Sequence, residues 1–135
     1  MLGGEVRDEE LYVATKINVA ELLLSGCTTA VDHNYLRATP DLHQDTQIQA
    51  SHEMGIRYHH ARGSNSQGFD PIVEKEEDVL ADTTRLIKTY HDPKPGAMLR
   101  IENAPGAPFS MSARFFQKRI ALARGYGVGN HTHLA

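Results

Sequence analysis

The sequence has little of several features that assign a chain to a special class of protein. It contains one cysteine, Cys27, and no tryptophan among 135 residues, so an internal disulfide framework is excluded and a reducing compartment is expected. It has no long apolar run, and its amino terminus lacks the charged-then-apolar pattern of a secretion signal. These absences predict a cytoplasmic protein that does not cross a membrane.

An excess of charge of one sign is also missing. Lysine and arginine number 14 against 17 aspartates and glutamates, which gives a formal net charge of −3. No basic stripe with interleaved aromatic residues occurs, so we expect no nucleic-acid partner. The hydrophobic content of 40% and the length are those of one ordinary globular domain with a core of its own.

The chain does contain a regular alternation of helical and strand patterns. Helices are predicted over residues 8–25, 41–54, 74–91 and 112–125, and strands over residues 27–33, 55–62, 97–104 and 127–135. The apolar stripe of the first helix is expected to comprise Val13, Ile17, Ala20 and Leu24. Helices that connect successive strands indicate an α/β fold with about four parallel strands, in either a closed (β/α)₈ barrel or an open, doubly wound sheet.

Polar side chains follow each predicted strand at its carboxyl end. They are Asp32, His33 and Asn34 after the first strand, Arg62 and Ser64 after the second, Asn103 after the third, and His131 and His133 at the fourth. Both candidate architectures place their chemistry at the carboxyl ends of parallel strands. We therefore expect these side chains to share one hollow.

The final pair of histidines forms a His-x-His pattern. On a strand, His131 and His133 would point the same way, and imidazoles aimed at one point are ligands for a divalent metal. A metal site needs three or four protein ligands, so other positions would have to complete it. The alternative is two ordinary histidines on a half-exposed strand.

The other candidate residues have ordinary alternatives too. His33 could contact a substrate or cap the next turn, and Arg62 could clamp a carbonyl or anionic ring or form a salt bridge that holds its loop. Ser64 has no identifiable base beside it, which favours a turn residue over a nucleophile. The acidic residues Glu74, Glu76, Glu77 and Asp78 are expected to be a solvated first helical turn.

Several motifs in order along the chain resemble landmarks of one enzyme superfamily. They are Leu-Leu-Leu-Ser-Gly-Cys-Thr-Thr at 22–29, Asp-His at 32–33, Ala-Arg-Gly-Ser at 61–64, Pro-Phe-Ser at 108–110 and His-Thr-His-Leu-Ala at 131–135. The sequence resembles the amidohydrolase superfamily, and within it the aminohydrolase branch of 8-oxoguanine deaminases and of hydroxyatrazine and chlorotriazine hydrolases. The resemblance implies a partial (β/α)₈ barrel of metal-dependent hydrolase type. Residues 1–135 would be a single partial barrel domain that supplies strands 2 to 5, a fragment truncated at both ends.

The resemblance also implies a reaction and a set of site residues. The full-length parent would hydrolyse a C–N bond of a purine-like or triazine heterocycle with a water activated by one divalent metal, Zn²⁺ or alternatively Fe²⁺. His133 would be a metal ligand. The candidate substrate-binding residues, taken from their place at the strand ends, are His33, Arg62, Ser64 and Asn103. The family's catalytic glutamate would come directly after Ala135, so no catalytic residue is expected within the chain and the isolated chain should be inactive.

Two expectations concern partners. The parent would act on a small heterocyclic molecule and assemble as a homo-oligomer. The competing hypothesis is a complete, non-catalytic α/β domain that binds a small ligand or a partner protein.

Overall fold

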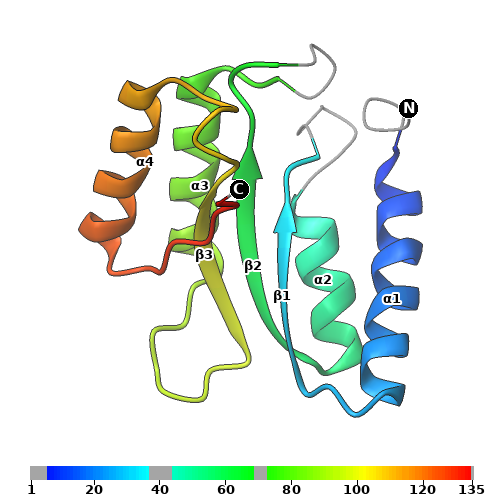
Figure 1. The fold of residues 1–135 in the computed structure, drawn as a ribbon. Coiled ribbons are helices and arrows are strands. Elements are labelled where there is room, and N and C mark those ends of the chain that lie inside the picture. The colour runs from blue at the N-terminus through cyan, green and yellow to red at the C-terminus, as the bar shows by residue number, and fades with distance from the viewer. Residues whose placement is uncertain (1–5, 37–43, 69–72, 135) are drawn as a thin grey trace.

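Helices and strands alternate along the chain in the computed structural model, which describes residues 6–36, 44–68 and 73–134 (Figure 1). The elements are α1 (Asp8–Leu24), β1 (Thr29–Asn34), α2 (Gln44–Met54), β2 (Arg57–Ser64), α3 (Glu76–Tyr90), β3 (Leu99–Pro105) and α4 (Ala113–Tyr126). The α/β alternation expected from the sequence is confirmed, except that residues 41–43 of the second predicted helix lie outside the described residues. None of the helices in these ranges has the length and apolar character that crossing a membrane requires.

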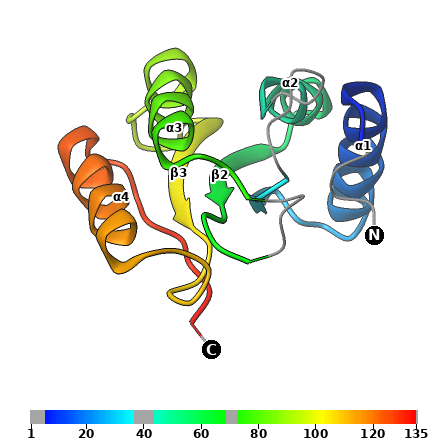
Figure 2. The same ribbon diagram turned by 90° about the horizontal axis from the view of Figure 1, so that it is seen from above.

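The three strands form a parallel sheet in the order β1-β2-β3. Asn34 pairs with Arg62, and Arg62 with Asn103, so the carboxyl ends of the strands lie level with one another. Seen from above, the four helices form an arc along one side of the sheet (Figure 2). Parallel strands with crossover helices on one side have the arrangement of a sector of a (β/α)₈ barrel, which is the architecture that the family resemblance implied.

The expected fourth strand is present only as a single bridge. The segment after α4 runs parallel to β3 and pairs with it at Asn103 and Asn130. Its amide groups reach β3 and the following loop, since the His131 N–H donates to the Asn103 carbonyl at 2.9 Å and the His133 N–H to the Gly106 carbonyl at 3.0 Å. Glycines at 127 and 129 weaken the preference of this segment for a regular strand, because they offer no side chain to pack.

The main core lies between the sheet and the helices. Each of the four helices contributes to it, and its buried members are Val19, Ile48, Ile56, Tyr58, Leu86, Ile87, Ile101, Ala123 and Val128. A smaller cluster of Val79, Met111 and Phe115 joins α3 to α4. Most of the buried apolar area is therefore on the helix-facing side of the sheet.

The apolar stripe predicted for α1 is wrong. The structure buries a neighbouring face of the helix, with Leu11, Thr15 and Val19, against α2. Val13, Ile17 and Leu24 of the predicted stripe are 50%, 58% and 84% exposed. Apolar residues occur around much of this helix, so the three-and-four spacing fits more than one face and cannot select the buried one.

Candidate metal and substrate site

The polar residues at the strand ends divide into two sets that point to opposite sides of the sheet. Asn34, Arg62 and Asn103 are cross-strand partners, so their side chains share one face, and that face carries the helices. His33 precedes Asn34 and therefore points to the opposite face, which we call the inner face. The expectation of one shared hollow is wrong, because adjacent residues in a strand alternate between its two faces.

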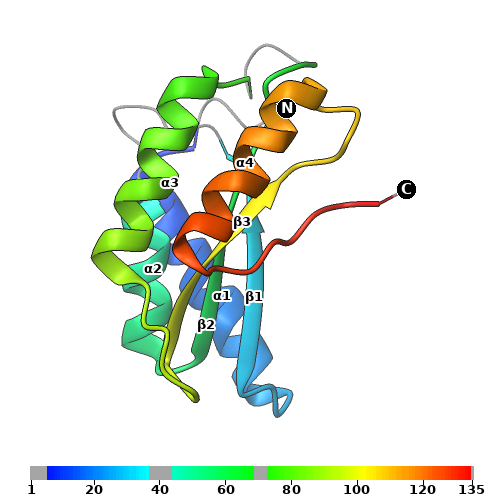
Figure 3. The same ribbon diagram turned by 90° about the vertical axis from the view of Figure 1, so that its left-hand side faces the viewer.

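Three imidazoles gather at the carboxyl end of the inner face. The His33 ring centroid lies 5.3 Å from that of His131, nearly at right angles, and 4.8 Å from that of His133, nearly parallel. His33 comes from β1, whereas the other two belong to the terminal segment, which passes β3 on the side away from α3 (Figure 3). The fold therefore brings together histidines about 100 positions apart in the sequence.

The environment of His33 keeps its ring neutral. Burial and the neighbouring imidazoles of His133 and His131 lower the pKa of His33 to about 4. Both of its ring nitrogens are buried and neither makes a hydrogen bond of regular geometry, although the Ala104 backbone acts to raise the pKa of the ring. Gly63 makes room for this ring, because a Cβ at position 63 would lie 2.7 Å from the His33 side chain. At neutral pH, His33 thus offers one ring nitrogen as a donor and the other as an acceptor.

A small hollow adjoins His133 on the same end of the sheet. It has a volume of about 160 Å³ and is lined by Tyr35, Asn65, Gly106, Ala107, Phe109, Ser110 and His133. Its rim is partly aromatic, because Phe109 is 75% exposed in the loop that follows β3. Complete small-molecule pockets enclose roughly 300–1,000 Å³, so the described residues supply one part of such a pocket.

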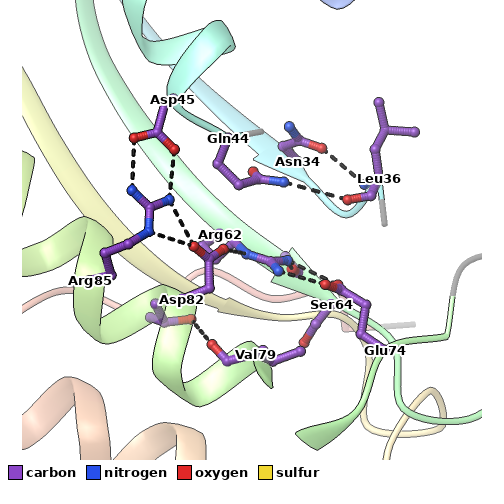
Figure 4. Close-up of polar contacts among 12 residues, drawn as sticks. Asn34, Leu36, Gln44, Asp45, Arg62, Ser64, Glu74, Val79, Asp82 and Arg85 are labelled. Atoms are coloured by element: carbon purple, nitrogen blue, oxygen red, sulfur yellow. Dashed lines mark hydrogen bonds and ion pairs between the residues drawn. The ribbon is translucent and has the colours of Figure 1, made fainter. Parts of the chain in front are cut away.

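On the helix-facing side, Arg62 is the centre of a buried ion-pair network (Figure 4). Its Nη2 and Nη1 donate to the two carboxylate oxygens of Glu74 at 2.7 and 3.1 Å, and its Nε donates to Asp82 at 2.8 Å. Arg85 extends the network by pairing with both Asp82 and Asp45. Arg62 therefore forms salt bridges, as the ordinary alternative for this residue predicted. Glu74 was expected in a solvated first turn, but its side chain is nearly buried and lies just before α3.

Ser64 and Asn103 are held by a second buried arginine, Arg119 of α4. Arg119 donates from Nη1 to the Ser64 hydroxyl and from Nε to the Asn103 side-chain oxygen, both at 2.6 Å. Burial and the nearby Arg62 cation lower its pKa to about 9, so it remains charged at neutral pH. Sequence reasoning missed Arg119. The sequence does contain a signal for it, because Arg119 lies four residues from both Phe115 and Ala123 and therefore on the same buried face of α4.

The structure thus joins two of the predicted site residues and separates the other three from them. His33 and His133 lie together on the inner face, while the side chains of Arg62, Ser64 and Asn103 are fully buried on the helix-facing side. Substrate contact by these last three remains a prediction that their geometry does not favour.

The imidazole nitrogens on the inner face are suitable ligands for a divalent metal, but they are too few to hold one. Neutral imidazole nitrogens are ordinary ligands for Zn²⁺ and Fe²⁺. Within residues 6–36, 44–68 and 73–134, however, no group of three or more histidine, cysteine or carboxylate side chains is placed to hold an ion. The described residues could therefore contribute a ligand to a metal centre but could not form a complete one.

The amino-acid sequence is similar to those of two bacterial hydrolases. The chain is 42% identical to the 8-oxoguanine deaminase of Pseudomonas aeruginosa over 136 residues, which cover 94% of this chain and 30% of that protein. It is 38% identical to the hydroxydechloroatrazine ethylaminohydrolase of Pseudomonas sp. strain ADP, with 96% of this chain and 29% of that protein covered. The chain therefore spans about 30% of the length of these relatives.

Solved structures show the same fold. The atrazine chlorohydrolase of Arthrobacter aurescens TC1, complexed with zinc, matches 98% of this chain and 31% of its own with a TM-score of 0.89 and 30% identity. An amidohydrolase from an environmental sample of the Sargasso Sea matches all of this chain and 35% of its own, with a TM-score of 0.92 and 29% identity. The model of the amidohydrolase family matches residues 1–135, so the chain belongs to the amidohydrolase family.

Proposed function

We propose that this chain forms part of the active site of a metal-dependent hydrolase that releases an amine from a small nitrogen heterocycle. The observation that carries the proposal is the gathering of His33, His131 and His133 at the carboxyl end of a parallel sheet, in a chain of the amidohydrolase family. The similar deaminase and ethylaminohydrolase supply the reaction class, hydrolysis of a C–N bond on a purine-like or triazine ring. The family match over the whole chain favours this function over a non-catalytic binding domain.

In this proposal His133 is the chain's metal ligand, and the metal is Zn²⁺, with Fe²⁺ as the alternative. When bound, such an ion lowers the pKa of a coordinated water so that hydroxide is available near neutral pH. The zinc in the similar atrazine chlorohydrolase supports a divalent ion. The His133 backbone is anchored to the Gly106 carbonyl at 3.0 Å, which holds its ring at the end of the sheet beside the small hollow.

His33 is proposed to contact the heterocycle. Its ring is neutral at pH 7 because its pKa is lowered to about 4, and neither of its nitrogens makes a hydrogen bond of regular geometry. Such an imidazole can donate to a ring nitrogen or carbonyl of the substrate and accept from an exocyclic amine. Either bond would relieve the cost of leaving buried polar nitrogens unpaired.

Arg62, Ser64 and Asn103 are proposed to act on the site indirectly. Their side chains join β2 and β3 to α3 and α4, and this fixes the strand ends from which the inner-face residues project. Substitutions there should change the geometry of the site without removing a group that touches the substrate. A homo-oligomeric parent and a cytoplasmic location are further predictions.

The test is a comparison of variants in the protein that carries this chain. We expect the His133→Ala variant to lose metal affinity by at least about tenfold. Substituting a residue that only hydrogen-bonds to a metal ligand already lowers metal affinity by about 10–100-fold. Release of ammonia from 8-oxoguanine and of ethylamine from hydroxyatrazine should fall with metal content. His52→Ala, which removes an exposed imidazole from α2, is the matched control. Zinc content and turnover that are equal in the two variants would contradict the proposal.

A further inference from the structure

Arg119 joins the carboxyl ends of two strands to α4. Its fully buried guanidinium uses all three nitrogens, with Nε on the Asn103 side-chain oxygen, Nη1 on the Ser64 hydroxyl and Nη2 on the Arg62 carbonyl at 2.7 Å. All three acceptors are neutral oxygens. Burying a cation among neutral acceptors is unfavourable, but the planar fork of an arginine sets the relative positions of all the groups that it contacts.

The contact with Arg119 determines which way the amide of Asn103 faces. Because the Asn103 side-chain oxygen accepts from Arg119 Nε, its Nδ2 is directed to the Asn130 side-chain oxygen at 2.7 Å and to the Arg119 carbonyl at 3.2 Å. Inverting the amide would place its NH₂ against a guanidinium donor, and its oxygen could no longer donate to Asn130. Arg119 therefore favours the one orientation in which Asn103 can donate to Asn130.

Asn103 is also the point at which the terminal segment is attached to the sheet. Its backbone N–H donates to the Gly129 carbonyl at 3.0 Å, and its carbonyl accepts from the His131 N–H at 2.9 Å. The segment forms a single bridge with β3, and its other contacts with this end of the sheet come from the His133 N–H and the Thr132 hydroxyl, which both donate to the Gly106 carbonyl. A slip of one residue would turn every side chain of an extended segment to the opposite face.

The side chain of Asn130 lies with that of Asn103 on the helix-facing side, and this aims its neighbours the other way. In an extended segment, residues 131 and 133 then both face the inner side. There their rings contact His33, at centroid distances of 5.3 and 4.8 Å. Holding Asn130 on one face is thus equivalent to directing the two imidazoles to the other.

We propose that Arg119 is a positioning residue for His131 and His133: by orienting Asn103 it fixes the register of residues 129–133 against β3. The link runs from α4 through Asn103 and Asn130 to the imidazole cluster, and none of these three residues contacts the hollow beside His133. Only the consequence for metal binding rests on the proposed function. The placement of the imidazoles can be measured without a metal.

The experiment compares Asn130→Ala and Arg119→Lys with Thr83→Ala. Asn130 is exposed, so its loss should leave the fold intact. A lysine keeps the charge of Arg119 but cannot reproduce its fork. Thr83 is the matched control, because it is fully buried on α3 and its hydroxyl donates to the Val79 carbonyl of the same helix, so it has no hydrogen bond to Asn103 or to the terminal segment. Amide hydrogen exchange and the nuclear Overhauser contact between the His33 and His133 rings report the position of the segment.

In Asn130→Ala and Arg119→Lys we expect hydrogen exchange at the His131 amide to rise about tenfold or more relative to β2 amides, with loss of the ring contact. Thr83→Ala should keep the ring contact and raise exchange evenly across the sheet. The proposal is overturned if either Asn130→Ala or Arg119→Lys leaves the ring contact and the His131 exchange unchanged, or if Thr83→Ala alters them equally. A zinc titration of His133→Ala separates the two claims: if zinc binding is indifferent to His133, the metal role fails while the positioning role stands.

Discussion

Replacing His60 should flatten the dependence of the protein's stability on pH. His60 is fully buried on the helix-facing side of β2, and both of its ring nitrogens lack a hydrogen-bond partner. Burial and the Arg62 cation lower its pKa to about 3, against the opposing influence of Asp82 and Asp45. The folded protein therefore keeps this ring neutral under conditions in which an unfolded chain would protonate it.

The magnitude follows from the difference between the two pKa values. As the pH falls below the ordinary value of 6.5, the unfolded chain binds a proton that folded His60 does not accept until about pH 3, so folding becomes less favourable. At pH 5 the unfolded pKa is 1.5 above the pH, and at about 1.4 kcal/mol per unit the cost is about 2 kcal/mol. Above pH 6.5 this cost disappears.

The assay is urea unfolding followed by circular dichroism at pH 7 and pH 5, with linear extrapolation to water. The free energy of unfolding of His60→Gln should fall between these two pH values by about 2 kcal/mol less than that of the unmodified chain. His52→Gln, which replaces an exposed histidine of α2, is the matched control and should behave as the unmodified chain does. If His60→Gln shows the same pH dependence as the control to within about 0.5 kcal/mol, the reasoning about His60 is refuted.

Three further predictions concern packing and charge, each measured as a free energy of unfolding in urea. Glu74→Gln should destabilise the fold by about 3 kcal/mol, because it leaves the buried Arg62 cation with one carboxylate partner. Glu77→Gln, at an exposed position, should change the free energy of unfolding little, and equal effects of the two variants would contradict the network. Leu11→Ala should cost about 2–5 kcal/mol and Leu24→Ala less than about 0.5 kcal/mol, because the two leucines are 6% and 84% exposed. A larger cost for Leu24→Ala would instead support the apolar stripe predicted from the sequence. Gly106→Ala should cost about 1–3 kcal/mol, because its Cβ would lie 2.8 Å from the Ser64 carbonyl oxygen. Gly125→Ala, in α4 with nothing within 4 Å, should instead stabilise the protein slightly, so a shared sign would count against the close packing at Gly106.

Sequence periodicity predicted the order of elements well because helices and strands leave different spacings of apolar residues. The start of α3 was readable from its acidic first turn and its end from the prolines that follow, and the start of α4 from its serine cap. The end of α4 was expected near Gly125, and the structure places its cap at Gly127. Periodicity failed at α1, where apolar residues lie on several faces, and at the terminal segment, where the pairing with β3 depends on Asn103 of another element. Contacts between elements leave no periodic signal in the sequence.

The candidate site was predictable in part for the same reason. His33 and His133 belong to local motifs at strand ends, and the structure places both on the inner face. Three other candidates also lie at strand ends, namely Arg62, Ser64 and Asn103. Because side chains alternate along a strand, a shift of one position relative to His33 puts theirs on the helix-facing side. Strand boundaries read from sequence are uncertain by more than one residue, so they cannot decide between the two faces.

The central claim is that His133 is the imidazole through which this chain holds a divalent metal. A zinc titration of the protein that carries this chain, followed through the ring signals of its histidines by nuclear magnetic resonance, tests this most directly. The claim predicts that the His133 ring responds first, and that His133→Ala abolishes the response of its neighbours His33 and His131. If zinc instead perturbs the exposed His52 ahead of His133, or perturbs His33 and His131 equally without His133, the claim is contradicted.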